Sequence, residues 1–221
     1  MNARQFASLF LVVSSLVCLS LRAQDASELV SPAHKIAIDQ PPTDWKPLFD
    51  ELAHRSTVSA LFTENRYLPF KKIPVVFEGE IRFSRERGLG LHYLQPDNRI
   101  LIVDTQGVLA RDAKGRPHEL SDARAQGTVG PLLNVMSFDL PELAKNFDLY
   151  GVRTGKTWRL AFEPRTSELA NSLSRLVISG RDAGVSKIEM RKSSLLSVEI
   201  LIHDAKENVP FTPEEIAKFF R

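Results

Sequence analysis

Apolar side chains that alternate with polar ones dominate two long stretches of the chain. The first stretch runs through TVSALFTENRYL, VVFEGEIRF, LGLHYLQ and RILIVD, and the second through KTWRLAFEP, LSRLVISG, VSKIEMRK and SVEILIHD. A period of two places the apolar side chains of a strand on one face. Short turns that contain Gly, Pro, Asp or Asn separate these segments, as in an antiparallel meander. The pattern therefore predicts a large antiparallel sheet with one apolar face.

Four helices are predicted outside these strands. DWKPLFDELAHR has apolar residues at helical spacing with Asp44 as its N-cap, and DLPELAKNF begins at Asp139. PFTPEEIAKFFR carries a capping box formed by Thr212 and Glu215, and PLLNVM is a short apolar segment. We expect an α+β fold in which a strongly curved antiparallel sheet, a half-open barrel, carries helices over its concave face. The pattern fits a filled interior and a hollow one equally well.

The first 23 residues have the layout of a secretory signal peptide. Arg4 precedes an uncharged apolar run that ends near Ala23, after which we expect cleavage. A retained anchor is the alternative, although the run is shorter than the ~20 apolar residues that span a bilayer. Lipidation at Cys18 is disfavoured because Val17, which is not a small residue, precedes it. Residues 24–43 contain several prolines and are expected to form an extended segment before a single domain at 44–221.

Composition argues against several classes of function. The chain has 29 basic and 27 acidic residues, and loss of Arg4 and Arg22 with the leader leaves 27 of each. A neutral chain gives no sign of nucleic-acid binding, and loss of the leader also removes the only cysteine. The histidines are too scattered for a zinc site, and His92 and His203 fall on the polar faces of their strands, which predicts solvated imidazoles. We expect no metal, no cofactor and no enzymatic activity.

A specific motif lies at residues 78–109. Gly79 and Glu80 open a strand that leads to Arg85, QPD at 95–97 ends the next strand, and ILIV before Asp104 forms a third. This order, without a gap, resembles the periplasmic outer-membrane lipoprotein carriers of the LolA type. FTEN at 62–65, GPLLNVM and the FTP near the C-terminus are similar to other segments of that family.

The chain departs from the family at three positions and also adds a C-terminal helix, which suggests a divergent branch. Glu86 stands where the family usually has proline, and Leu91 and Leu109 stand where it has aromatic residues.

The resemblance implies a cavity for acyl chains between the sheet and a lid helix. Arg85 would act as a latch that hydrogen-bonds to the lid. The cavity would be lined by Ile81, Phe83, Leu91, Tyr93, Ile100, Trp158, Leu160 and Phe162. The lid would present Leu132, Leu133, Val135 and Met136. An ordinary packed core needs the same residue types, so that alternative stays open.

The resemblance also implies a function and partners. The chain would be a monomeric periplasmic carrier that shields the acyl chains of lipoproteins or related lipids during transfer to the outer membrane. An inner-membrane donor complex and an outer-membrane acceptor would be its partners. A lipid-sensing or regulatory module of the same fold is the main alternative, and an exported hydrolase with an unrecognised site is a weaker one.

Overall fold

The computed structural model describes residues 28–119, 133–193 and 195–221. All the strands in these ranges join one twelve-stranded sheet in which neighbouring strands are antiparallel. The predicted signal peptide lies outside the described residues.

The order of helices and strands along the chain is close to the predicted one: a helix, a run of strands, a helical segment, a second run of strands and a final helix. In chain order they are η1 Pro32–His34, β1 Lys35–Ile36, α2 Lys46–Ala53, β2 Thr57–Tyr67, β3 Val75–Ser84, β4 Gly88–Gln95, β5 Arg99–Asp104, β6 Gly107–Arg111, β7 Pro117–Glu119, α4 Leu140–Asn146, β8 Phe147–Thr154, β9 Thr157–Pro164, α5 Ser167–Ser172, β10 Arg175–Arg181, β11 Gly184–Arg191, β12 Ser197–Glu207 and α6 Pro213–Phe219. A further helical segment lies at 133–137. None of the helices within the described ranges is long and apolar enough to cross a bilayer.

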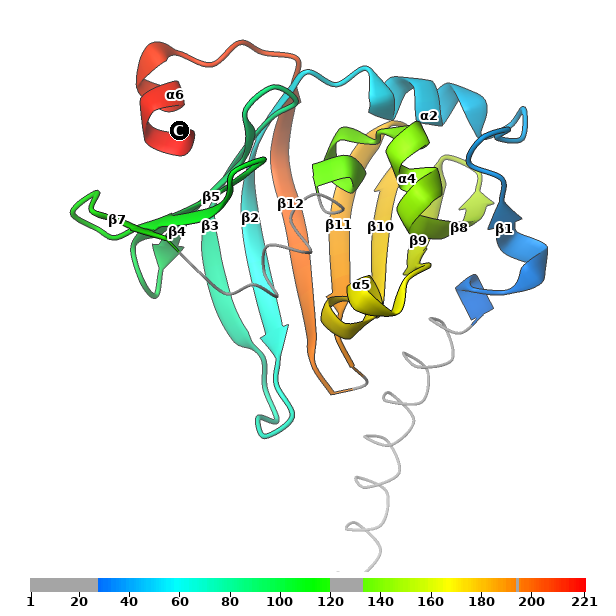
Figure 1. Cartoon of the computed structure of the whole chain (residues 1–221), viewed down its shortest axis with the longest axis horizontal. Helices are drawn as coiled ribbons and strands as arrows, with labels where there is room; N and C mark the ends of the chain where they lie inside the picture. The colour runs from blue at the N-terminus through cyan, green and yellow to red at the C-terminus, as the bar shows by residue number, and fades with distance from the viewer. Residues whose placement is uncertain (1–27, 120–132, 194) are drawn as a thin grey trace, which may run out of the picture.

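Two meanders make up the sheet. The strands from β2 to β7 form one and those from β8 to β12 form the other, and β12 pairs with β2 to join them. The sheet is curved and does not close, because β1 and β7 remain at its two edges (Figure 1). The predicted α+β fold with a curved antiparallel sheet is therefore confirmed.

The inner, concave face carries the apolar side chains that the alternation predicts. The pairing of Ala60 with Ile81, and of Ile81 with Leu91, places one such row across β2, β3 and β4. The helices α2 and α4 and the 133–137 helix lie over this face (Figure 1). Phe49 of α2 and Leu143 of α4 are fully buried in the same core.

The helix starts follow local capping chemistry, with one exception. The Asp139 side chain accepts a hydrogen bond from the Glu142 backbone N–H, as predicted for the start of α4. The capping box of Thr212 and Glu215 is present at α6. The predicted N-cap Asp44 is wrong, because α2 begins at Lys46 after Trp45, whose backbone is already helical.

The C-terminal helix α6 lies on the outer face of the sheet, against β4 and β5 (Figure 1). Phe219 and Phe220 are each 1% exposed. A Cβ at position 90 would lie 2.5 Å from the Phe219 carbonyl oxygen, so glycine at 90 is what lets the helix approach this closely. The sequence predicts this helix, but its position on the outer face differs from the expected arrangement, in which helices cover the concave face.

The α6 helix also corrects one prediction. His92 is buried rather than solvated: its ring packs on Phe219 with centroids 6.0 Å apart, and its two nitrogens lie 3.1 Å from Glu80 and Asn98 oxygens. The helix α6 therefore covers the outer face of β4 around His92. His203 is exposed, as predicted.

Two carboxylates hold α6 on the sheet. The Thr212 backbone N–H and Arg82 Nε donate to Glu215 at 3.0 and 2.9 Å, and these bonds lower the pKa of the Glu215 carboxyl. Burial opposes ionisation of Glu80, but its hydrogen bond with His92 and the attraction of Lys218 of α6, whose Nζ lies 3.5 Å from Glu80 Oε2, outweigh burial and lower its pKa. Both groups therefore stabilise the docked helix in their ionised forms.

The N-terminal segment takes part in the fold instead of only preceding it. β1 pairs with β8, and Leu29 and Ile36 are 2% and 4% exposed. The strand β8 and the short helix α5 were not predicted. In β8, an inward position is occupied by Gly151, and the outward Tyr150 and Val152 are apolar, so the alternation on which a strand prediction depends is lost.

Candidate functional site

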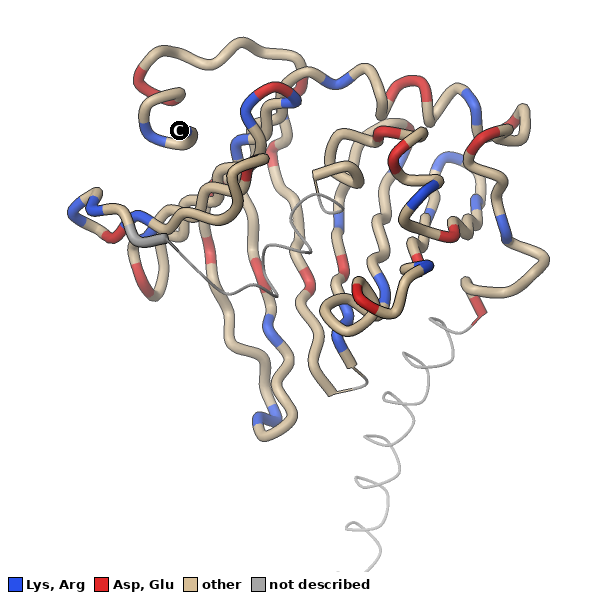
Figure 2. Tube along the Cα trace, viewed as in Figure 1, with Lys and Arg blue, Asp and Glu red and all other residues tan. Residues whose placement is uncertain are grey.

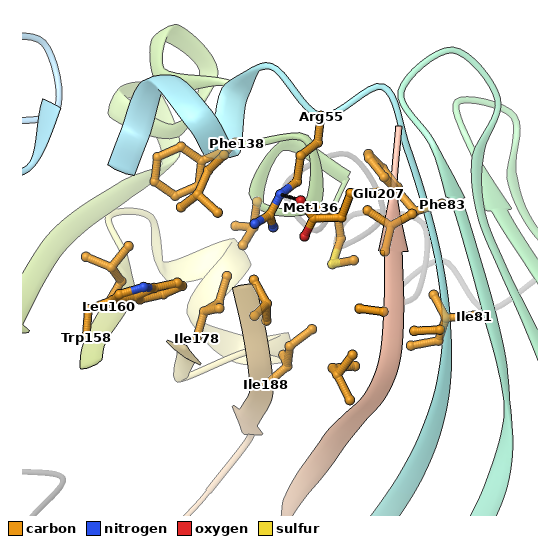
Figure 3. A pocket seen from close by; sticks show the side chains of 17 residues that line it. Arg55, Ile81, Phe83, Met136, Phe138, Trp158, Leu160, Ile178, Ile188 and Glu207 are labelled. Atoms are coloured by element: carbon orange, nitrogen blue, oxygen red, sulfur yellow. Dashed lines mark ion pairs between the residues drawn. The ribbon is translucent and has the colours of Figure 1, made fainter. Parts of the chain in front are cut away.

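A mainly apolar cavity of about 60 Å³ lies between the inner face of the sheet and the helices that cover it (Figure 3). Its walls come from β2, β3, β9, β10, β11 and β12, and its cover comes from α2 and residues 135–138. It is lined by Leu52, Arg55, Val58, Ala60, Ile81, Phe83, Val135, Met136, Phe138, Trp158, Leu160, Ile178, Val185, Ile188, Ile202, Ala205 and Glu207. This volume holds a few water molecules. An acyl chain is larger, so its entry requires the cavity to widen.

Half of the predicted cavity residues line this cavity. Ile81 and Phe83 face it from β3, and Trp158 and Leu160 face it from β9 (Figure 3). The Trp158 ring is fixed by a hydrogen bond from its Nε1 to the Asp182 carbonyl oxygen at 2.7 Å. These four side chains come from segments far apart in the sequence, which the sheet brings together.

Three other predicted residues lie on the inner face but outside the cavity lining. Leu91 is partly buried beside Ile81, to which it is paired. Tyr93 is 3% exposed and packs on Phe62 in an edge-to-face contact. Phe162 is fully buried and contacts Phe138 in the main core. Their placement is that of packed core residues.

Ile100 lies on the opposite face of the sheet, so its place differs from the prediction. It is paired with His92, whose side chain faces α6, whereas its neighbour Leu101 is paired with the inner-face residue Leu91. The run ILIV has no polar residue to mark the alternation, so the sequence does not reveal which of its members faces inward.

Three of the four predicted lid residues lie within the part of the chain that the structure describes. Val135 and Met136 line the cavity, and Leu133 is partly buried against the core. Leu132 lies outside the described residues. The 133–137 helix thus presents apolar side chains to the inner face of the sheet.

Arg85 lies directly after β3 and connects three parts of the chain. Its guanidinium donates to the carbonyl oxygens of Ala53 and Arg55, at and just after the end of α2. Its Nη2 also donates to the Ser137 carbonyl oxygen, at 2.7 Å, at the end of the 133–137 helix. A cation is favourable at both helix C-termini, where the last carbonyl groups lack partners within the helix.

An ion pair between a buried arginine and a partly exposed glutamate lies at one end of the cavity and was not predicted from the sequence. Arg55 Nε lies 2.9 Å from Glu207 Oε2, and the Arg55 side chain is 8% exposed (Figure 3). The Arg55 Nη2 donates to the Ala183 carbonyl oxygen. Burial lowers the pKa of Arg55 against the attraction of Glu207, yet a guanidinium stays charged in proteins. The pair marks the polar end of an otherwise apolar lining.

The geometry of this site supports binding of an apolar group. Within the described residues, no group of three or more His, Cys, Asp or Glu side chains converges to hold a metal ion. The lining offers hydrocarbon contacts along most of its length and one ion pair at its end.

Comparison with known families gives a match over most of the chain. The model of a family described as "Outer membrane lipoprotein carrier protein LolA-like" matches residues 37–208. The matched span runs from before α2 to the end of β12 and stops before α6. No curated protein matches the sequence.

Several crystal structures align with most of the chain at low sequence identity and low TM-scores. A DUF1329 family protein from Desulfovibrio piger has a TM-score of 0.47 and 9% identity, and the alignment covers 78% of this chain and 94% of that one. A LolA superfamily protein from Nitrosomonas europaea has a TM-score of 0.42 and 6% identity, with 80% and 97% covered. LprF from Mycobacterium bovis has a TM-score of 0.35 and 12% identity, with 78% and 96% covered.

Proposed function

Because the chain belongs to the family of LolA-like outer membrane lipoprotein carrier proteins, we propose that it is a periplasmic carrier of lipoproteins or related lipids. It shields their acyl chains in its cavity during transfer to the outer membrane. The observation that carries this proposal is the mainly apolar cavity between the concave face and the 133–137 helix. The predicted signal peptide supplies the route of export.

The cavity must open and close for such a carrier to work. Hydrocarbon burial contributes about 0.8 kcal/mol per methylene, so ~15 methylenes gain on the order of 12 kcal/mol in a complete apolar pocket. Binding of that strength would prevent delivery. The 133–137 helix packs on the sheet, and its displacement during loading would offset part of the gain.

Arg85 is proposed as the latch of the closed state. Its bond to the Ser137 carbonyl oxygen would break when the 133–137 helix moves away from β3. Its bonds to the carbonyl oxygens of Ala53 and Arg55 would hold the end of α2 in place. Cargo entry would thus work against a charged hydrogen bond, which lowers net affinity and favours release to a stronger acceptor.

Native mass spectrometry of the gently purified protein tests this function. We expect adducts with the mass of acylated lipids or lipoproteins, and uptake of an added diacyl lipid by the lipid-free protein. A lipid-free protein that also ignores added lipid and lipoprotein would refute the proposal. Stable lipid binding without any transfer between membranes would instead favour the sensing module.

A further inference from the structure

A second polar group lies on the inner face, at the end of β3 remote from Arg85. This polar cluster consists of Glu64, Arg66, Tyr93 and Arg99. The register places Glu64 opposite Phe77, and Tyr93 opposite Arg99, so all of them share the face that also forms the cavity.

The carboxylate of this polar cluster is already paired. Glu64 is 3% exposed, forms an ion pair with Arg66 and accepts a hydrogen bond from the Tyr93 hydroxyl at 2.7 Å. The Arg66 Nη2 also donates to the Tyr93 hydroxyl, at 3.3 Å. Since Arg66 balances Glu64, these two charges cancel locally.

Arg99 leaves a positive charge without a counter-ion among the described residues. Its guanidinium carbon lies 5.0 Å from the centre of the Tyr93 ring and 5.9 Å from that of Phe77. Its Nε is buried and has no hydrogen-bond partner within the described part of the chain. A buried donor without a partner is unfavourable because it has lost its hydrogen bonds to water, so native proteins seldom keep one without a reason.

The surroundings of Arg99 suit a bound anion. Arg66 also lies over the Phe77 ring, 4.1 Å from its centre, so aromatic faces hold both guanidinium groups. A guanidinium that rests on a ring keeps its in-plane N–H groups free for a carboxylate or phosphate, which it binds in a fork. The excess of positive charge around Arg99 is local, because positive and negative residues are interspersed along the rest of the chain (Figure 2).

We propose that Arg99, with Arg66 beside it, binds the anionic headgroup of an amphiphile whose tail enters the cavity. Phe77 and the cavity residue Ile81 are four positions apart on β3, or roughly 13 Å at 3.3 Å per residue. A headgroup at the polar cluster would thus be within one acyl-chain length of the apolar lining. This inference rests on the proposed carrier function and narrows its cargo to lipids with a phosphate or carboxylate group.

Two lipids with the same tail test the headgroup site. Oleoyl lysophosphatidic acid carries a phosphate, and mono-oleoylglycerol is its neutral counterpart. Isothermal titration of the full mature chain should give at least tenfold tighter binding of the phosphate lipid. Arg99→Gln should reduce this preference to twofold or less without changing the affinity for the neutral lipid. Arg99→Lys, which keeps the charge but loses the fork, should retain an intermediate preference.

The controls separate the possible failures. Arg87→Gln removes an exposed positive charge away from the polar cluster and should keep the wild-type preference. Equal binding of the two lipids by the wild-type protein would refute the headgroup site alone, whereas binding of neither lipid would refute the carrier function as well. If glycerol phosphate binds with the same affinity as the phosphate lipid, the site binds free phosphate esters rather than a lipid headgroup, and the proposal is wrong.

Discussion

Replacement of Arg85 by leucine is the perturbation that separates loading from delivery. The side chain donates to the Ser137 carbonyl oxygen at the end of the 133–137 helix and to two carbonyl oxygens at the end of α2. Leucine keeps much of the side-chain volume but makes none of these bonds. We expect Arg85→Leu to loosen the cover of the cavity while the sheet remains intact.

The size of the effect follows from the bond to Ser137. A hydrogen bond from a charged donor contributes about 1.5–3 kcal/mol. Arg85 is exposed, and solvent screening reduces this to about 1 kcal/mol, which is a roughly fivefold change in an equilibrium constant. If the closed form dominates in the wild-type protein, the open population rises and the apparent Kd for lipid falls by the same factor.

A transfer assay with a fluorescent acylated lipid measures both consequences. Donor vesicles load the protein, and acceptor vesicles then remove the lipid. Arg85→Leu should load with about fivefold higher affinity and release several times more slowly than the wild-type protein. Arg87→Leu is the matched control, since Arg87 is exposed and its backbone lies in the same turn.

One result would refute the latch directly. Wild-type affinity and wild-type release by Arg85→Leu, in a protein with unchanged circular dichroism, would mean that the bond to Ser137 does not limit opening. Weaker loading would point instead to a role of Arg85 in holding cargo.

Three further predictions concern the cover of the cavity and the C-terminal helix. Leu133→Asp should abolish lipid binding in a titration and leave the protein folded; loss of folding would show that Leu133 belongs to the core. Gly90→Val should displace α6 because its side chain would overlap Phe219, and increased proteolysis confined to the C-terminus would report this; an unchanged digestion pattern would contradict it. The lowered pKa values of Glu80 and Glu215 predict that their contribution to α6 docking is present above the ordinary glutamate pKa of about 4.3 and is lost as pH falls through their folded-state values. Hydrogen exchange of the α6 amides should therefore accelerate at pH 3 relative to pH 7, normalised for intrinsic rates, and equal protection would oppose this.

Local patterns predicted the secondary structure well where polar residues marked the alternation. In β9, Trp158 and Leu160 alternate with Arg159, and the strand and its inner face follow from this. The capping box at Thr212 likewise fixed the start of α6. A capping box is a property of one helix, however, and it carries no information about the face of the sheet on which that helix packs.

The parts of the site that were not predicted depend on contacts between distant segments. Arg55 and Glu207 meet only because β12 pairs with β2, and no short-range pattern links them. The buried state of His92 depends on α6, which crosses a face that the alternation marks as polar. The cavity itself has no sequence signature, because a filled core and a cavity are lined by the same types of apolar residue.

The most direct measurement tests whether an acyl chain enters this cavity. The chain has two tryptophans, of which Trp158 lines the cavity and Trp45 does not. The substitution Trp45→Phe therefore leaves Trp158 as the source of tryptophan fluorescence. Titration with a lipid brominated along its acyl chain should quench the emission of Trp158, and the same lipid without bromine should bind without quenching. Saturable binding of the brominated lipid that leaves this emission unchanged would place the acyl chain elsewhere and contradict the carrier mechanism.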